Sequence, residues 1–207
     1  MRIISGEYKG RRLSPVKGAD IRYTSDRVKE SLFSILSSTV SGSRFLDIFA
    51  GSGNVGIEAF SRGAESLTFV DINPVCIRAI SSNLEHCGID PNPPQVKFVK
   101  MGALMAIDYF RRRGMDFDII FLDPPYVADF VEKCLLRISE CNILTEDGLV
   151  IAEHDVKEKA PTDAGNLVMI RQEKYGTTIL SFYKFKVFQS ELPRLKARLL
   201  RACLKKL

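Results

Sequence analysis

The chain has 207 residues, of which 45% are apolar and 27% charged, and its formal net charge is +5. A chain of this length can bury one full core, and its apolar stretches are too short to cross a membrane. The opening residues lack the apolar run of a secretory signal, so we expect one cytoplasmic domain. Five cysteines without a Cys-x-x-Cys pair, and only two histidines, predict neither disulfide bonds nor a metal site.

Positive charge is concentrated at the two ends of the chain. Residues 1–30 hold eight Lys or Arg against four acids, a net of +4, and residues 184–207 hold eight against one, a net of +7. The part between them is therefore acidic, with a net charge of −6. Such ends suit a polyanionic partner, for which nucleic acid is the natural candidate. For the last twenty residues the alternative is a solvated terminus without a partner.

The predicted elements follow one another as an alternating α/β series. Residues 1–20, in which Gly and Pro interrupt short apolar stretches, predict a small β appendage. Thr24 or Ser25 then caps a helix whose apolar stripe runs from Val28 to Leu36.

A glycine-rich loop follows the first strand of the main series. The apolar run Phe45–Phe49 predicts the strand, and Gly51, Gly53 and Gly56 after it match G-x-G-x-x-G and open a helix. Glycines let the backbone turn tightly and approach a ligand, and a helix N-terminus attracts anionic groups. In this context the loop predicts a site for a nucleotide-like cofactor.

An acid follows at the distance that such a loop requires. Asp71 ends the next apolar run, Leu67–Val70, where its carboxylate can bind ribose hydroxyls. Asn73 and Pro74 then begin a helix that Gly88 ends. A nicotinamide cofactor and S-adenosylmethionine both fit these features.

Asp47 favours the methyl donor over the dinucleotide. It lies four residues before Gly51, where its carboxylate could meet the amino acid end of S-adenosylmethionine, directly or through water. A dinucleotide-binding loop usually has an apolar residue there, so a dehydrogenase is the less favoured interpretation.

The second half of the chain continues the α/β alternation. A strand is predicted at Val96–Val99 and a helix through the basic run at 111–113, followed by a buried strand at Ile119–Leu122. A helix near Phe130–Ile138 then leads to a strand at Leu149–Glu153.

The series ends with an expected hairpin. Strands at Leu167–Gln172 and Thr178–Phe185 are joined by a turn at Tyr175-Gly176. This pattern predicts a parallel sheet that is finished by an antiparallel strand. A helix is expected beyond Ser190.

Asp123-Pro124-Pro125-Tyr126 directly follows the strand at Ile119–Leu122, at the edge where open α/β sheets bind ligands. The exocyclic amine of a base is a poor nucleophile because its lone pair is delocalised into the ring. The Asp123 carboxylate and the Pro124 carbonyl could accept the two amine protons and turn that lone pair outward, on a backbone that two prolines restrict. Tyr126 offers a face on which the base could stack. Asp-Pro-Pro alone is also ordinary turn chemistry.

Together these residues resemble the RsmD-like family. Its members are bacterial enzymes that methylate guanine N2 in 16S ribosomal RNA, the RNA of the small ribosomal subunit. The resemblance runs from Met1 to about Lys186 and is carried by four segments: 1–11, 22–33, 46–64 and 123–126. It implies a class I, Rossmann-like methyltransferase fold, with a seven-stranded mixed sheet and helices on both faces. It also implies S-adenosylmethionine as donor, S-adenosylhomocysteine as product and no metal. The implied partner is ribosomal RNA in an assembling or assembled small subunit, and we expect a monomer without a membrane partner.

Motifs and resemblance together assign the site. The expected catalytic residues are Asp123, Pro124, Pro125 and Tyr126. The donor is assigned to Asp47, Phe49, Ala50, Gly51, Gly53, Asp71, Ile72, Asn73, Gly102 and Ala103. RNA contacts are assigned to Arg2, Lys9, Arg11, Arg12, Arg22 and Arg27. The appendage at 1–20 is expected to contact RNA, the methyltransferase domain to span 21–186, and a basic helix or tail to occupy 187–207.

Three features depart from the family pattern. Arg22-Tyr23-Thr24 stands where Arg-Pro-Thr is usual. Gly102 replaces the polar residue that usually faces the adenine, and a backbone amide could substitute for it. The basic tail from Val187 lies outside the resemblance.

Two other functions suit part of this pattern. A related enzyme could methylate DNA or a protein glutamine amide, because the tetrapeptide chemistry suits any planar amide or arylamine. A catalytically silent RNA-binding assembly factor could keep the fold, but the intact set of Asp47, Gly51, Gly53, Asp71 and Asp123 argues against it. The choice of guanine N2 rests on the resemblance alone.

Overall fold

The computed structural model describes residues 1–16, 23–91, 94–125 and 129–186. The strands are β1 (Arg44–Ile48), β2 (Ser66–Val70), β3 (Val96–Val99), β4 (Phe117–Leu122), β5 (Leu144–Asp155), β6 (Asp163–Ala164), β7 (Leu167–Tyr175) and β8 (Thr178–Phe185). The helices are α1 (Asp26–Leu36), α2 (Asn54–Ser61), α3 (Pro74–His86), α4 (Ala103–Arg112) and α5 (Phe130–Cys141), and a short 3-10 helix, η1 (Ser37–Thr39), follows α1.

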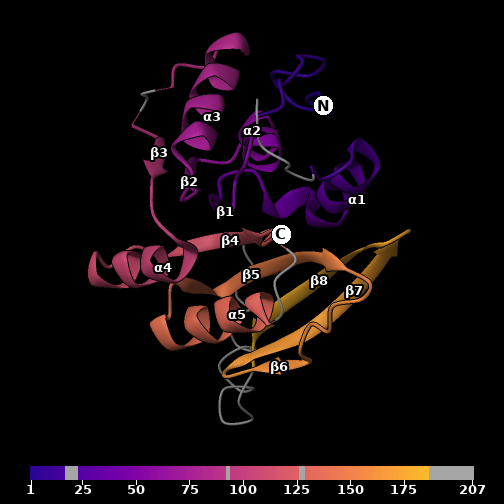
Figure 1. The fold of residues 1–207 in the computed structure, drawn as a ribbon, viewed down its shortest axis with the longest axis vertical. Helices are drawn as coiled ribbons and strands as arrows, with labels where there is room; N and C mark the ends of the chain where they lie inside the picture. The colour runs from indigo at the N-terminus through magenta and orange to yellow at the C-terminus, as the bar shows by residue number, and fades with distance from the viewer. Residues whose placement is uncertain (17–22, 92–93, 126–128, 187–207) are drawn as a thin grey trace, which may run out of the picture.

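The strands form one mixed sheet in the order β3-β2-β1-β4-β5-β8-β7-β6 (Figure 1). The pairs from β3 to β5 are parallel, and β8, β7 and β6 are added in antiparallel pairs. The predicted antiparallel finish is therefore confirmed. The predicted number of seven strands is wrong, because β6 adds an eighth. Its two residues, Asp163 and Ala164, pair with β7 and are too few to carry the apolar run that marks a strand in sequence.

Helices cover both faces of the sheet, as predicted. Helices α1, α2 and α3 share one core with alternate residues of β1 and β4, whereas α4 and α5 pack on the other face (Figure 1). In β1, for example, Phe45 belongs to the first core and Leu46 to the second. Because both faces are buried, the parallel strands are continuous apolar runs in sequence, which is why they could be predicted.

The order of the strands reverses between β1 and β4. The chain moves from β1 outward to β3, then returns to the far side of β1 with β4. Ile48 and Leu122, the last residues of these two neighbouring strands, are paired in register. The loops that carry the glycine motif and Asp123 therefore leave the sheet side by side, at the place where open α/β sheets bind ligands.

The N-terminal segment lies on α2. Arg2 and Arg12 form an isolated antiparallel bridge, and the Ile3 amide donates to the Arg11 carbonyl at 2.9 Å. Gly6 has φ +88°, and a Cβ there would lie 1.8 Å from the Ser61 carbonyl oxygen. Only glycine permits this approach, which seats the segment directly on the end of α2.

Two helix starts follow the predicted capping. The Ser25 hydroxyl accepts from the Val28 amide at the start of α1, so Ser25 is the cap and Thr24 is not. The Asn73 side chain accepts from the Val75 amide at the start of α3, with Pro74 in the first turn.

Candidate active site

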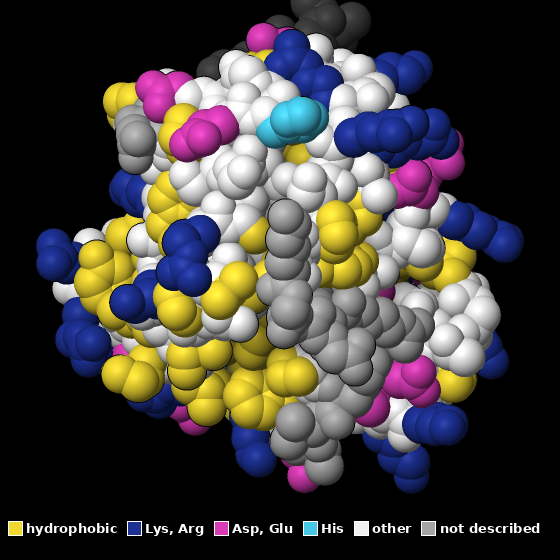
Figure 2. All heavy atoms as spheres, turned by 45° about the horizontal axis from the view of Figure 1, so that its top comes forward, with side chains coloured by type: hydrophobic (Ala, Val, Ile, Leu, Met, Phe, Trp, Pro, Cys, Tyr) yellow, Lys and Arg dark blue, Asp and Glu magenta, His cyan; other side chains and the backbone are white. Residues whose placement is uncertain are grey.

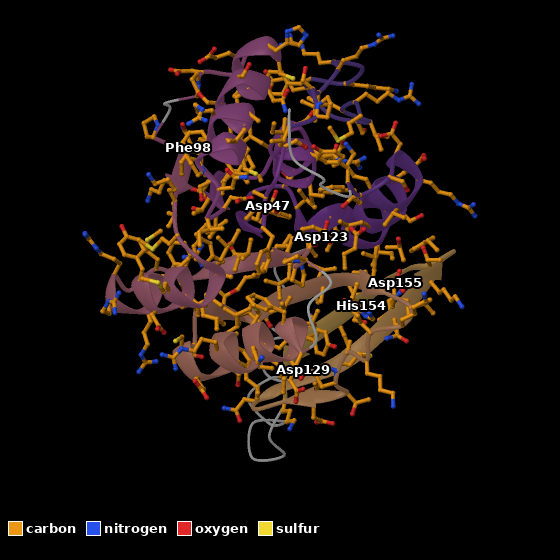
Figure 3. The ribbon with its side chains drawn as sticks, viewed as in Figure 1. Asp47, Phe98, Asp123, Asp129, His154 and Asp155 are labelled. Carbon is orange, nitrogen blue, oxygen red and sulfur yellow. The ribbon has the colours of Figure 1, made fainter. Side chains whose placement is uncertain are left out.

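A cavity of about 630 Å³ opens at the carboxyl ends of β1, β2 and β4. This volume lies within the range of small-molecule and cofactor sites. Its described lining is Tyr23, Thr24, Asp47, Phe49, Ala50, Gly51, Ser52, Asn54, Val55, Asp71, Ile72, Asn73, Cys76, Phe121, Asp123, Pro124 and Pro125. Most of the predicted donor residues thus share one cavity with the first three residues of the predicted catalytic motif. Figure 3 shows Asp47 and Asp123 close to the centre of the molecule, at the ends of β1 and β4.

The glycine loop turns sharply as it leaves β1. Gly51 and Gly53 have φ of +54° and +78°, the left-handed region that glycine enters without cost. Phe49 also has a positive φ, +66°, which is unusual for an aromatic residue and stores strain at the cavity. The Phe49 and Ala50 amides both donate to the Val70 carbonyl, which fixes the loop against β2.

Asp71 holds this loop from the neighbouring strand. One carboxylate oxygen accepts from the Gly51 amide at 3.0 Å and the other from the Asn73 amide at 2.8 Å. Each carboxylate oxygen can accept a second hydrogen bond, so Asp71 can support the loop and still receive ribose hydroxyls.

Asp47 is 2% exposed and lies beneath the loop. Its Oδ2 accepts from the Gly56 amide at 2.9 Å, and burial raises the pKa of this carboxyl to about 7. A Cβ on Gly56 would lie 2.5 Å from the Phe69 ring. The third glycine of the motif therefore permits α2 to pack closely on the sheet, which brings its N-terminus to the cavity.

The Asp-Pro-Pro turn forms the opposite wall. Asp123 is half-buried, and its amide donates to the Ile48 carbonyl at 3.4 Å. Pro124 is buried and Pro125 exposed, and both line the cavity. Tyr126, the fourth residue of the motif, lies outside the described residues.

Three predicted donor residues are not in the cavity lining. Gly53 supports the loop turn, and Gly102 and Ala103 begin α4 beside the cavity. A Cβ on Gly102 would lie 3.8 Å from the Ile72 side chain, which lines the cavity and is 72% exposed. Gly102 therefore adjoins the cavity wall without forming it.

A buried lysine, Lys29, lies behind the cavity. From the sequence it contributed only to the positive charge of residues 1–30. Lys29 is fully buried, and its Nζ donates to Asn54 Oδ1 and to the Arg2 carbonyl, both at 2.7 Å. It also lies 3.4 Å from a carboxylate oxygen of Glu58. Burial lowers the pKa of Lys29, and Glu58 opposes that shift. Its position next to Val28, in the apolar stripe of the helix, is the sequence feature that could have indicated this burial.

Two further side chains attach the N-terminal segment to the donor loop and α2. Glu58 accepts from the amides of Ile4 and Ser5 at 2.7 and 3.0 Å. Asn83 exchanges two hydrogen bonds with the Ser14 backbone and donates to the Ser52 carbonyl in the glycine loop. The segment predicted to contact RNA is thus fixed to the loop predicted to hold the donor.

The predicted RNA-binding side chains that the structure describes are exposed: Arg2, Lys9, Arg11, Arg12 and Arg27. Arg2 lies 3.3 Å from Asp26, and the Arg11 guanidinium lies 5.1 Å from the centre of the Tyr8 ring. Arg22 lies outside the described residues. On the face shown in Figure 2, Lys and Arg side chains are scattered among neutral and apolar ones.

In residues 1–16, 23–91, 94–125 and 129–186, no group of three or more His, Cys, Asp or Glu is arranged to hold a metal ion. Within the same ranges, no helix has both the length and the apolar character needed to span a bilayer.

Comparison with known proteins places the chain among methyltransferases. The family described as conserved hypothetical protein 95 matches residues 1–184. YlbH of Bacillus subtilis, named as a candidate rRNA methyltransferase, is 42% identical over 89% of this chain and 98% of its own length. Ribosomal RNA small subunit methyltransferase D of Haemophilus influenzae is 30% identical over 89% of this chain and 93% of its own.

Solved structures give the same result for the fold. A candidate methyltransferase from Escherichia coli, yhhF, has a TM-score of 0.76 at 27% identity, covering 91% of this chain and 99% of its own. A candidate methylase from Haemophilus influenzae, HI0767, has a TM-score of 0.73 at 29% identity, and the match covers 90% of this chain and 98% of HI0767. The predicted Rossmann-like methyltransferase fold is confirmed.

Proposed function

We propose that this chain, which belongs to the RsmD-like family, transfers a methyl group from S-adenosylmethionine to the exocyclic N2 amine of a guanine in small-subunit ribosomal RNA. The observation that carries the proposal is one shared cavity. The glycine loop with Asp47 and Asp71 forms one side of it, and Asp123 with its two prolines forms the other.

Charge favours S-adenosylmethionine over a dinucleotide. The described lining includes three carboxyl side chains, Asp47, Asp71 and Asp123, and neither Lys nor Arg. Such a lining suits a donor with a sulfonium and an ammonium group and opposes a pyrophosphate. S-adenosylmethionine supplies an electrophilic methyl group there. The names of the two relatives described above, a candidate rRNA methyltransferase and a ribosomal RNA small subunit methyltransferase, support the same choice.

The residues of this chain would bind the donor in two places. Asp71 accepts the ribose hydroxyls, while Asp47 faces the amino acid end directly or through water. Ile72, exposed at the cavity edge, offers apolar cover for the adenine. A bound ammonium group near Asp47 favours its ionised form and returns its pKa toward the ordinary value.

The acceptor chemistry rests on orientation. Asp123 and the Pro124 carbonyl accept the two amine protons, so the nitrogen lone pair points toward the donor. The new N–C bond forms as the C–S bond breaks, and the methylated nitrogen, now cationic, then loses a proton. Asp123 need not remove that proton beforehand. A guanine within structured RNA must first be extruded into the cavity, at a cost of roughly a few kcal/mol.

The exposed basic side chains of the N-terminal segment and of Arg27 in α1 offset part of that cost. Phosphate contacts from Arg2, Lys9, Arg11, Arg12 and Arg27 supply affinity without base specificity and make binding weaken as salt rises. We expect the substrate RNA to be part of an assembling or assembled small subunit.

A methyl-transfer assay tests the proposal. Labelled S-adenosylmethionine is supplied with small subunits from cells that lack this protein and, in parallel, with protein-free ribosomal RNA, DNA and total protein. Nucleoside analysis is expected to find the label in N2-methylguanosine. Label only in DNA or in protein amide would select a different acceptor. Label in none of them would contradict the enzyme and favour a silent assembly factor.

A further inference from the structure

Thr24 joins the two sides of the cavity. This residue precedes α1, is 4% exposed and lines the cavity. Its hydroxyl donates to Glu153 Oε2 at 2.6 Å, and its carbonyl accepts from Asn54 Nδ2 at 2.9 Å. One contact leads to β5, beside the Asp-Pro-Pro strand, and the other to the first residue of α2, directly after the glycine loop.

Glu153 lies next to the predicted catalytic residue. Leu122, the last residue of β4, pairs with Ala152 of β5, so Asp123 directly follows β4 at the level of Glu153 on β5. By strand alternation both lie on the sheet face that α1 and α2 cover. Glu153 is 3% exposed, and a buried carboxylate is costly unless hydrogen bonds compensate. At 2.6 Å, the bond from Thr24 has the length of a charge-assisted one.

The orientation of the Asn54 amide is fixed by its neighbours. Lys29 can only donate, so it must face Asn54 Oδ1, at 2.7 Å. The Thr24 carbonyl can only accept, so it must face Asn54 Nδ2. Lys29, Asn54, Thr24 and Glu153 therefore form one directed chain of buried hydrogen bonds that runs from α1 past the donor loop to β5.

We infer that Thr24 and Glu153 are positioning residues for methyl transfer. Their hydrogen bond holds the cavity wall between the donor loop and Asp123, and so sets the approach of the acceptor amine to the methyl group. This inference rests on the proposed function. The capping of α1 does not require Thr24, because Ser25 caps that helix. A packing role alone would not require its hydroxyl to meet a buried carboxylate.

Two substitutions of Thr24 separate its hydroxyl from its shape. Thr24→Val keeps the size and removes the hydrogen bond, whereas Thr24→Ser keeps the hydroxyl. With saturating donor and RNA, we expect Thr24→Val to lower kcat by about 10- to 100-fold, the range expected for misplacement of reacting groups. Thr24→Ser should stay within about threefold of wild type, and both variants should bind S-adenosylhomocysteine within about threefold of wild type. Glu153→Gln, which can still accept from Thr24, should lie between the two.

Several results would overturn the inference. They are a wild-type kcat in Thr24→Val, an equal loss in both Thr24 variants, or a loss explained by weaker binding of S-adenosylhomocysteine alone. Methylation of RNA by the wild-type protein tests the proposed function separately from the role of Thr24. If the wild type methylates no RNA, amide hydrogen exchange of residues 24–28 decides. Faster exchange in Thr24→Val than in Thr24→Ser supports the positioning bond, and equal exchange overturns it.

Discussion

The donor side and the acceptor side of the cavity are built in different ways. On the donor side, Asp71 and Asp47 bond to amides of the glycine motif, 20 and 9 residues away. On the acceptor side, Thr24 reaches Glu153, 129 residues away. The first side is a local loop that a short sequence motif specifies. The second is assembled by the fold, so substitutions far from the reacting groups can disturb it.

The sharpest separation of the two sides is expected from Asp123→Ala. Removing the carboxylate that orients the amine should lower kcat by at least about 10²–10³-fold, the loss typical of one removed transition-state contact. Donor affinity should stay within about threefold, because the donor side keeps all its contacts. Labelled methyl transfer and calorimetric titration with S-adenosylhomocysteine measure the two quantities.

Asp147→Ala is the matched control for that substitution. Asp147 is an exposed aspartate near the amino end of β5, and its loss should leave both quantities unchanged. A near-normal kcat in Asp123→Ala would contradict the assigned role and remove the chemical difference between the two sides.

What could be predicted from sequence follows the same division. The strands at 45–49 and 119–122 and the loop with Gly51 and Gly53 are local signals, and the structure places them at one cavity. The partnership of Thr24 with Glu153 carries no local signal, because folding alone brings residues so distant in sequence together. The sequence left Thr24 and Ser25 as equal candidates for the helix cap, and the structure has the Ser25 hydroxyl accepting from the Val28 amide while the Thr24 hydroxyl donates to Glu153.

Other details escaped prediction for different physical reasons. The strand β6 has two residues and no apolar run. The positive φ of Phe49 is imposed on a residue type that avoids that conformation, so sequence preference points the wrong way. Lys29 is a charged residue whose burial depends on acceptors from Arg2, Asn54 and Glu58, which lie outside its own helix.

Lys29→Met tests whether the acceptor side depends on the buried network. The substitution leaves the Arg2 carbonyl and Asn54 Oδ1 without their lysine donor, while Glu58 keeps its ion pair with Arg62. We expect the free energy of unfolding to fall by about 1–3 kcal/mol, the cost of buried acceptors left unsatisfied. Urea unfolding measures the change. Lys133→Met, at an exposed lysine of α5, should change it by no more than about 0.5 kcal/mol.

A double substitution identifies the cause of that loss. Lys29→Met and Glu58→Gln, measured singly and together, form a double-mutant cycle, and if the two side chains interact the double variant should lose less stability than the sum of the single losses. If Lys29→Met lowers the free energy of unfolding by less than about 1 kcal/mol, the buried network does not stabilise this region. The acceptor side would then not depend on Lys29.

Asp47→Asn tests the donor side through pH. The folded-state pKa of Asp47, about 7, lies above its ordinary value of 3.8. Wild-type stability should therefore fall as pH rises from about 4 to 7, because the folded state holds a proton that the unfolded state has lost. Asparagine cannot ionise, and its side-chain oxygen can still accept from Gly56. We expect Asp47→Asn to be the more stable protein at pH 8, by up to about 4 kcal/mol.

Urea unfolding of the ligand-free protein at pH 5, 6, 7 and 8 measures this difference. Asp147→Asn, at an exposed aspartate, should show the wild-type pH dependence. A constant difference between Asp47→Asn and wild type over this range would mean that Asp47 ionises normally. The donor loop would then rest on an ordinary carboxylate.

The smallest expected effect belongs to Gly102→Asp, at the edge of the donor side. Gly102 is the N-cap of α4, with φ −65° and ψ 148°, a conformation open to any residue, and glycine has no side chain with which to cap the helix. A Cβ there meets nothing closer than the Ile72 side chain at 3.8 Å. Aspartate can therefore cap the helix and should raise the free energy of unfolding by a few tenths of a kcal/mol.

Gly102→Asp would also restore a polar group beside the adenine position, so S-adenosylhomocysteine should bind more tightly. Gly102→Ala separates these effects, because it adds the Cβ without the carboxylate and should give neither gain. If the Gly102→Asp and Gly102→Ala variants bind S-adenosylhomocysteine with equal affinity, the backbone already supplies the adenine contact. The departure from the family pattern at this position would then have no consequence for donor binding.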